Sequence, residues 1–369
     1  MNIVMATRGY DRWTAKELER RGLRMLGEDL RRKHRRMAKR GAFAFLRATY
    51  YRWAQLWPER CAGLAKAPRV LAVGDLHIEN FGTWRDAEGR LCWGVNDFDE
   101  AHPLAYANDL VRLAASATLA AEEGVVKAKP AAIARAILDG YAARLASGGE
   151  PFVLEENNAA LRAMAYRGEN EPKRWWTELE AELFAARPPA EVQALIAADW
   201  PKGAKARYWF RSAGLGALGR PRYVATARWH GGQIAREAKA LVPSAATWAE
   251  GGRDAASRSA EALARAVRSP DPFHRIDRNW VVRRLAPRSS KIEIGSLAKK
   301  NEPLALLSAM GGETANVHLG WARAIAAVRR DLARRRPGWL GEAAEAMAGA
   351  MRSEWTAWKN SKAWPAKGR

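Results

Sequence analysis

A short apolar segment that ends in a group of polar residues constrains this chain more than any other feature. Residues 70–73 (VLAV) are typical of a buried strand, and Gly74-Asp75 ends that strand abruptly. His77, Glu79 and Asn80 follow at once. A buried strand is not normally followed so closely by side chains of these types unless a polar group is held there. We therefore take this loop as the first candidate site.

Length and composition indicate a globular protein with more than one lobe. The chain has 369 residues, of which 48% are hydrophobic, enough to build a sizeable core. No apolar run approaches the roughly 18 residues of a membrane span, and the first residues do not resemble a secretory signal. Cys61 and Cys92 have neither metal-ligand nor disulfide spacing. We expect a cytoplasmic protein without a membrane span.

The net charge of +22 favours contact with polyanions, although an Arg-rich composition explains it equally well. The most basic segment is RRKHRRMAKR (31–40), at the end of a helix that the leucine spacing predicts over residues 14–40. Such a run is either a solvated helix face or a contact for a polyanion.

Helical patterns dominate the first 200 residues and the last 70. Further helices are predicted over residues 43–57, from Asp109 onward, over 129–146, over 188–198 and after 303. Strands are predicted between them. Residues 207–240 contain strands, a glycine-rich loop and a tight turn, and residues 279–286 form one more strand. We expect a helical lobe over 1–204, a small antiparallel sheet over 205–295, and C-terminal helices over 296–369 that pack on the first lobe.

A second apolar strand lies close behind the first polar loop. Residues 91–95 (LCWGV) follow a turn at 86–89, and we expect them to pair with residues 69–73 in a hairpin spanning 69–100. Asp97 follows this strand and would return to the neighbourhood of Asn80. Carboxylate and amide oxygens are the ligands of Mg²⁺. Asp99 is either a further metal ligand or part of a solvated rim.

These segments resemble a known group of phosphotransferases. GDLHIENFG, GVNDFDEA and DLVRL are similar to motifs of aminoglycoside and choline kinases, and more closely to the bacterial domain-of-unknown-function 2252 family. The resemblance implies that Asp75 is catalytic, that Asn80 and Asp97 bind Mg²⁺, and that Asp109 braces the loop of Asp75. It also implies ATP as cofactor. His77 is either a second catalytic residue or a group that only positions Asp75.

A glycine-rich segment adds a possible phosphate-binding loop. Gly214, Gly216 and Gly219 form G-x-G-x-x-G between two strand-like segments, as in the hairpin of kinases, and backbone amides of such loops can approach phosphate. The phosphate-binding cation would be Arg236 or Lys239, which point to opposite faces of a strand.

The order of these motifs differs from that of ordinary kinases. The glycine-rich loop and its cation follow the catalytic loop instead of preceding it. Arg283 matches another position of the family, of unknown role. We expect an α+β, helix-rich, protein-kinase-like two-lobed fold with permuted lobe order.

Two other classes of function stay open. The strand followed by GDLH also resembles the first metal motif of metallophosphoesterases, but the six histidines do not supply the remaining motifs. A basic nucleic-acid-binding protein or a non-catalytic scaffold is the alternative outside catalysis, since 17 tryptophans suit base stacking. The preferred hypothesis is an ATP- and Mg²⁺-dependent phosphotransferase. Its acceptor, a small hydroxylated molecule or a protein, and the choice between phosphoryl and nucleotidyl transfer are not defined by the sequence.

Overall fold

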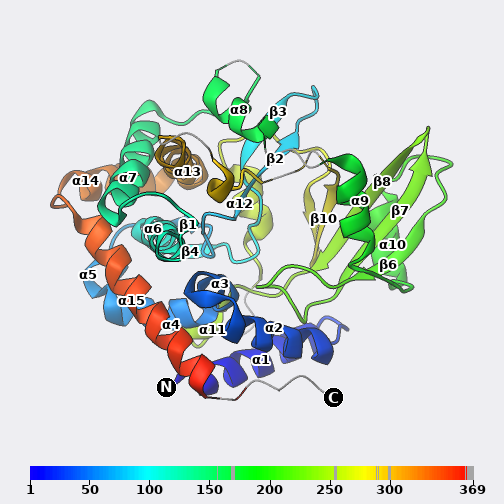
Figure 1. Cartoon of the computed structure of the whole chain (residues 1–369), viewed down its shortest axis with the longest axis horizontal. Helices are drawn as coiled ribbons and strands as arrows, with labels where there is room; N and C mark the ends of the chain where they lie inside the picture. Colours follow the sequence, from blue (N-terminus) through cyan, green and yellow to red (C-terminus); the bar gives the residue numbers. More distant parts are fainter. Residues whose placement is uncertain are drawn as a thin grey trace.

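Helices and an antiparallel sheet occupy different parts of the molecule (Figure 1). The computed structural model describes residues 1–155, 157–167, 171–252, 256–287, 289, 291–297, 301–361 and 363. Helices account for about 52% of the residues, which confirms the expected helix-rich α+β class. In the described part of the chain, no helix combines the length and the apolarity that crossing a bilayer requires.

The N-terminal segment is a series of helices rather than the two long ones expected. They are α1 (Ile3–Glu19), α2 (Gly27–Lys39), α3 (Gly41–Ala48), α4 (Tyr50–Arg60) and α5 (Ala62–Ala65). The single helix predicted over 14–40 is wrong because Gly22, at φ +69°, ends α1 in a left-handed turn. The Leu23 amide then donates to the Leu18 carbonyl and closes that turn.

Two short strand pairs follow. The strand β1 (Arg69–Ala72) pairs with β4 (His102–Ala105), and β2 (Phe81–Arg85) pairs with β3 (Leu91–Val95), both antiparallel. The hairpin expected between residues 69–73 and 91–95 is therefore wrong. Strand β2, with a glycine as its second residue, was missed in the sequence. Its pairing with β3 places Phe81, just after Asn80, opposite Val95, just before Asn96 and Asp97.

Six further helices contribute a large part of the hydrophobic core. They are α6 (Tyr106–Glu122), α7 (Pro130–Ser147), α8 (Ala159–Arg167), α13 (Glu302–Leu319), α14 (Ala322–Ala333) and α15 (Trp339–Asn360). Helices α7 and α13 approach closely because Gly140 and Gly311 face the partner backbone. An added Cβ would collide with the carbonyl oxygen of Ser308 or Ile137, respectively.

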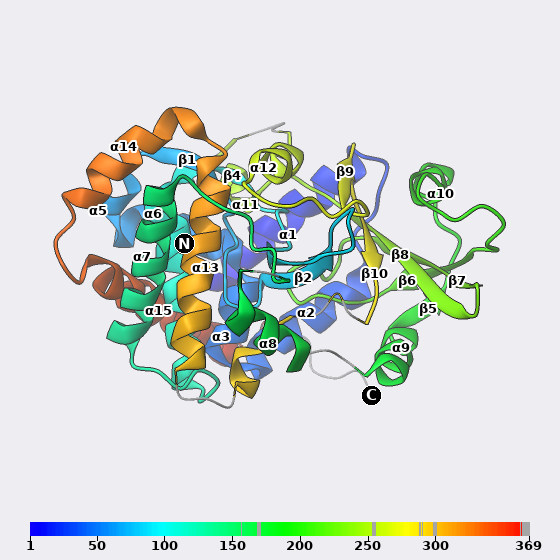
Figure 2. The ribbon, with the colours of Figure 1, turned by 90° about the horizontal axis from the view of Figure 1, so that it is seen from above.

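The second body is a six-stranded sheet in the order β5-β6-β7-β8-β10-β9 (Figures 1 and 2). Its strands are β5 (Leu183–Ala185), β6 (Arg207–Arg211), β7 (Arg222–Trp229), β8 (Gly232–Ala240), β9 (Arg275–Asp277) and β10 (Trp280–Leu285), all paired antiparallel. The remaining helices are α9 (Pro172–Glu180), α10 (Ala190–Ala197), α11 (Ala245–Ala249) and α12 (Ser259–Arg265), with a 3-10 turn at Ile294–Ser296.

Helices α9 and α10 cover opposite faces of this sheet. Leu179 of α9 packs with Val224 and Ala235 on one face, whereas α10 packs on the other face. Strand β5 and both helices thus associate with the sheet although they precede residue 205, where the sheet was expected to begin.

Candidate functional site

One polar cavity lies where the helical body meets the sheet, and several separate parts of the chain line it. The β1–β3 region contributes Asp75, His77, Glu79, Asn80, Asn96, Asp97, Asp99 and Glu100. The sheet contributes Gly214, Leu215, Gly216, Ala217, Arg220, Arg222 and Arg283. The N-terminal helices contribute Tyr10, Lys33, Arg47, Ala48, Tyr50 and Tyr51, and Lys291 completes the lining. Candidate residues that are distant in the sequence thus share one cavity.

The Asp75 loop (residues 73–80) is held from behind by helix α6. The Asp109 carboxylate accepts hydrogen bonds from the amides of Val73 (2.7 Å) and Gly74 (2.9 Å), and Ser116 Oγ accepts one from the Ile78 amide (3.1 Å). Asp109 is completely buried, and His318 Nε2 lies 3.1 Å from it. The expected role of Asp109 as a brace for this loop is confirmed.

Asp75 is fixed by an arginine that the sequence analysis missed. Arg112 Nε donates to Asp75 Oδ1 at 3.1 Å, and a second, shorter contact from Nη2 reaches the same oxygen. Arg112 is fully buried, with its guanidinium over the rings of Tyr50 and Trp53. The signal that could have found it is a lone arginine in an otherwise apolar, Ala-rich helix.

This arrangement leaves one oxygen of Asp75 available. Among the described residues no donor reaches Oδ2, and the side chain is 22% exposed. Burial raises the pKa of Asp75, an effect that the charge and hydrogen bonds of Arg112 partly offset. Asp75 can therefore accept a proton or a hydrogen bond from a ligand in the cavity.

Asn80 lies between the two acidic segments. Its Nδ2 donates to the carbonyl oxygens of Asp75 (3.1 Å) and Asp97 (3.0 Å), and the Asn96 amide donates to the Asn80 carbonyl. These contacts fix the orientation of the amide. Asn80 Oδ1 is buried, and no described group donates to it. Since a buried acceptor is seldom left unpaired, Oδ1 is suited to a cation or another ligand.

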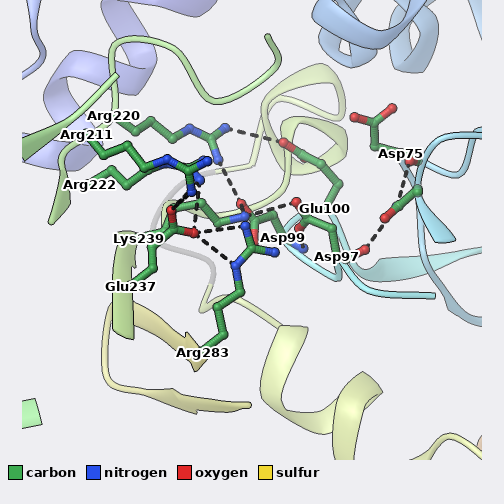
Figure 3. Close-up of polar contacts among 11 residues, drawn as sticks. Asp75, Asp97, Asp99, Glu100, Arg211, Arg220, Arg222, Glu237, Lys239 and Arg283 are labelled. Atoms are coloured by element: carbon green, nitrogen blue, oxygen red, sulfur yellow. Dashed lines mark hydrogen bonds and ion pairs between the residues drawn. The ribbon is translucent and has the colours of Figure 1, made fainter. Parts of the chain in front are cut away.

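Lys239 joins the two acidic residues behind Asn80 to the sheet. Its Nζ lies 3.0 Å from Asp97 Oδ2 and 2.7 Å from Asp99 Oδ2 (Figure 3). Burial would raise the pKa of Asp97, but Lys239 and its other donors hold that pKa far below the usual range. Burial and the Asp97 charge raise the pKa of Asp99 to about 7. Asp97, 40% exposed, is thus the charged and accessible member of the pair.

A buried carboxylate on the same strand organises the cations of the sheet. Glu237 is fully buried, and arginines of three strands donate to it, namely Arg211 (2.7 Å), Arg222 (3.0 Å) and Arg283 (2.9 Å). Burial opposes ionisation, yet these arginines hold the pKa of Glu237 well below its usual value. Glu237 and the arginines other than Arg283 were missed, although Glu237 shares a strand face with Lys239.

The structure separates the two proposed phosphate cations. Lys239 points toward the acidic residues, whereas Arg236 lies on the opposite face with its guanidinium 4.3 Å from the Phe273 ring centroid. Burial and nearby Arg284 lower the pKa of Arg236 to about 10. Neither Lys239 nor Arg236 is part of the cavity lining, whereas Arg283 is.

The three glycines of the glycine-rich loop (residues 212–220) have different surroundings. Gly214 and Gly216 line the cavity. Gly219, at φ +97°, instead faces Met25 and Leu30, and its carbonyl accepts a hydrogen bond from the Leu26 amide. Gly219 therefore positions the loop on the helical body, and only the first two glycines can approach a ligand.

His77 makes its hydrogen bond within the Asp75 loop. Its Nδ1 accepts from the Glu79 amide at 3.2 Å. Burial, with the Arg47 charge as a further cause, lowers the pKa of His77 well below its usual value. A neutral His77 lines the cavity and shapes the loop, and the role of a proton donor or acceptor stays a prediction.

The residues that could hold a metal ion are few. Within the described residues, no three His, Cys, Asp or Glu side chains form a ready metal site. Lys239 and Arg220 already neutralise Asp99. Asn80 Oδ1 and Asp97 are the oxygens that suit Mg²⁺, which usually takes few protein ligands and completes its shell with phosphate and water. The donor set fits Mg²⁺ bound together with a phosphate ligand.

Comparison with known proteins identifies one family. No curated protein and no solved structure matches this chain. A family model described as "Uncharacterized protein conserved in bacteria (DUF2252)" matches residues 25–179 and confirms the resemblance to that family. The matched segment contains the Asp75 loop, Asp97 and Asp109, and it ends before the glycine-rich loop. Over residues 25–179, this chain is similar to the uncharacterised bacterial DUF2252 family.

Proposed function

We propose that this protein is an ATP- and Mg²⁺-dependent phosphotransferase that acts on a hydroxyl acceptor, built as a kinase-like pair of lobes in permuted order. The observation that carries the proposal is the convergence of Asp75, Asn80 and Asp97 on one cavity, opposite a glycine-rich loop. In kinases, an Asp of the catalytic loop, a following Asn and a second Asp have distinct roles around the phosphates.

Asp75 has the features of the residue that orients the acceptor. Arg112 holds one carboxylate oxygen from a buried position, so the other oxygen keeps a defined direction. A burial-raised pKa makes this carboxylate a better proton acceptor than a solvated one. We expect Asp75 to align the hydroxyl and to receive its proton as the acceptor oxygen bonds the γ-phosphorus and the bond from that phosphorus to the leaving ADP breaks.

Asn80 and Asp97 are the residues that would hold Mg²⁺. When bound, the ion neutralises phosphate charge. The protein's contribution is to keep the Asn80 amide fixed by two carbonyls and to keep Asp97 ionised beside Lys239. Lys239 and Arg283 bring positive charge from the sheet to the same side of the cavity, which favours an anionic ligand there.

The test is nucleotide- and metal-dependent stabilisation. Thermal unfolding of the wild type is compared with and without MgATP, and with ATP in EDTA. At a hundred times its dissociation constant a ligand stabilises the folded state by about 2.7 kcal/mol, a shift of a few degrees or less. We expect the Mg²⁺-dependent part to disappear in Asp97→Asn, in which Lys239 retains its contact with Asp99.

Two further variants separate binding from chemistry. Asp75→Asn should keep the MgATP shift because Asp75 is assigned to the acceptor, and Asp139→Asn, on the exposed side of α7, serves as the matched surface control. A folded wild-type protein that shows no shift with MgATP would contradict the proposal, as would an undiminished shift in Asp97→Asn.

A further inference from the structure

We propose that Lys33, within the basic helix α2, binds a phosphate group in the cavity, against the glycine-rich loop. This inference rests on the proposed function, because it assigns the anion-binding side of the same site. It concerns a residue outside the segments that carry the kinase resemblance. It can also be tested without Mg²⁺ and without catalysis.

Lys33 differs from the rest of its basic segment in where it lies. Arg31 and Lys39 are exposed, whereas Lys33 is only 5% exposed and lines the cavity. A macromolecular polyanion on the surface of α2 could contact the exposed residues but not Lys33. Only a small group that enters the cavity can reach its ammonium.

The surroundings of the Lys33 ammonium leave it under-satisfied. Nζ donates one hydrogen bond, to the Gly216 carbonyl at 3.1 Å, and lies 6.0 Å from the Tyr10 ring centroid and 5.9 Å from that of Tyr51. No described carboxylate comes within 4.0 Å of it. An ammonium has three N–H donors, and a buried charge normally has an opposite charge beside it. Burial lowers the pKa of Lys33 to about 8, which agrees with this lack of a carboxylate partner.

Two further donors of the cavity lack acceptors. Arg47 Nε and the Tyr50 hydroxyl are buried without a hydrogen-bond partner among the described residues, although Arg47 Nη2 is 2.7 Å from Glu79. Both residues line the cavity together with Lys33. Since buried donors are rarely unpaired, these two groups and the ammonium of Lys33, which has one hydrogen bond, indicate a ligand that offers several acceptor oxygens.

The unpaired groups of the cavity are of two kinds. One is an acceptor, Asn80 Oδ1, beside the Asp97 carboxylate. The others, Arg47 Nε and the Tyr50 hydroxyl, are donors. A phosphate that carries Mg²⁺ would satisfy both kinds of group. Its oxygens accept hydrogen bonds from the donors, and its cation is suited to the Asn80 oxygen. Gly214 and Gly216 line the same space, where the lack of side chains permits close approach of a phosphate.

The phosphate can belong to the nucleotide or to a phosphorylated acceptor, and three ligands distinguish these sources. Pyrophosphate in EDTA represents the nucleotide phosphates without the metal, glycerol phosphate represents a phosphomonoester acceptor, and MgATP represents the complete ligand. Affinities are measured by calorimetry, with thermal unfolding of each unliganded variant to verify that it is folded.

The variants isolate the charge of Lys33 from its hydrogen bond. Lys33→Gln retains an N–H donor for the Gly216 carbonyl but removes the charge, and Lys33→Arg retains the charge. We expect Lys33→Gln to weaken pyrophosphate and MgATP binding by roughly tenfold or more, because a charge-assisted hydrogen bond is lost, and Lys33→Arg to restore part of it. Lys39→Gln, on the exposed face of the same helix, should bind as the wild type does.

A second variant keeps the test valid if Lys33→Gln does not fold. Tyr50→Phe removes only the unpaired hydroxyl, so the fold should be retained while phosphate binding falls by a few-fold. If glycerol phosphate alone depends on Lys33, the site belongs to the acceptor, which still supports the inference.

The outcomes also separate this inference from the proposed function. Binding of MgATP that Asp97→Asn weakens and Lys33→Gln leaves unchanged would support the function and overturn the role of Lys33. Binding of pyrophosphate that requires Lys33, without any binding of MgATP, would support the role of Lys33 and overturn the proposed function. Equal affinity of wild type and Lys33→Gln for all three ligands, or no binding of any of them to the wild type, overturns the inference.

Discussion

The two loops that line the cavity are held in different ways. Buried side chains of α6 hold the Asp75 loop from behind. Asp109 and Ser116 accept hydrogen bonds from the backbone amides of this loop. The glycine-rich loop is anchored at some residues and exposed at others. Leu215 and Leu218 join the hydrophobic core and Ser212 donates to buried Asp29, whereas Gly214 and Gly216 are exposed.

This difference matches what each loop is proposed to do. A residue that aligns a reacting hydroxyl must keep its position to within fractions of an ångström, which requires support by buried and satisfied groups. A loop that covers phosphates must admit and release them, and the exposed Gly214 and Gly216 are the part of this loop least held by buried contacts. We therefore expect substitutions in the Asp75 loop to affect stability, and substitutions in the glycine-rich loop to affect ligand binding.

The largest expected effect on stability is that of Gly74→Ala. Gly74 has φ +80°, and an added Cβ would collide with the Glu100 carbonyl and lie 2.8 Å from the Tyr50 hydroxyl oxygen. We expect the free energy of unfolding to fall by about 3 kcal/mol, from the left-handed conformation and from overpacking. Chemical denaturation measures it.

Gly89→Ala is the matched control for that substitution. Gly89 has φ +76° in an exposed turn, and nothing lies within 4 Å of an added Cβ. Its cost should be that of the backbone conformation alone, about 1 kcal/mol. Equal losses at the two positions would contradict the idea that the Asp75 loop is fixed by its surroundings.

A buried glutamate that contacts the β2–β3 hairpin predicts that the free energy of unfolding depends on pH. Buried Glu313 of α13 accepts the Val95 amide at 3.1 Å, and burial, despite Arg268, raises its pKa to about 7. The folded state then binds more protons than the unfolded state between about pH 4.5 and 7, so this residue lowers stability as the pH rises through that window.

Glu313→Gln should remove this contribution. The change in the free energy of unfolding between pH 4.5 and 8 should differ from that of the wild type by roughly 3 kcal/mol, with the variant losing less stability on going to high pH. Denaturation curves at a series of pH values measure the difference. If the free energy of unfolding of both proteins depends on pH in the same way, the folded state does not raise the pKa of Glu313, and the prediction is wrong.

The smallest expected effect on stability is that of Gly216→Ala in the glycine-rich loop. The nearest atom to an added Cβ is the Arg47 carbonyl oxygen at 3.1 Å, and no positive φ is involved. We expect a loss below about 1 kcal/mol, together with a clear reduction of the MgATP-induced thermal shift. A loss as large as that of Gly74→Ala would show that both loops are equally rigid.

The parts of the site that could be predicted are those that local patterns encode. The apolar run before Gly74-Asp75, the strand before Asp97 and the glycines between β6 and β7 are recognisable because each depends on neighbouring residues alone. The strands predicted over 207–240 and 279–286 agree with β6, β7, β8 and β10 for the same reason. Asp109 was found through the family resemblance.

The missed residues depend on contacts between distant segments. Arg112, Glu237 and Lys33 are each one charged side chain in a regular element, and only the packing of other segments makes them buried. The pairing of β1 with β4 was missed because a strand's partner depends on the whole chain, whereas its existence depends on local residue types.

The sequence by itself determined which chemical groups stand at the ends of the strands, because the spacing of Asp75, Asn80 and Asp97 follows directly from the chain. The tertiary structure alone decided which cations face them. Lys239 and Arg236 are three residues apart on one strand, and the face of the sheet that packs against the helical body selects Lys239 for the acidic residues. The physical reason is that a buried charge is stabilised only by partners brought beside it, and those partners come from remote segments of the chain.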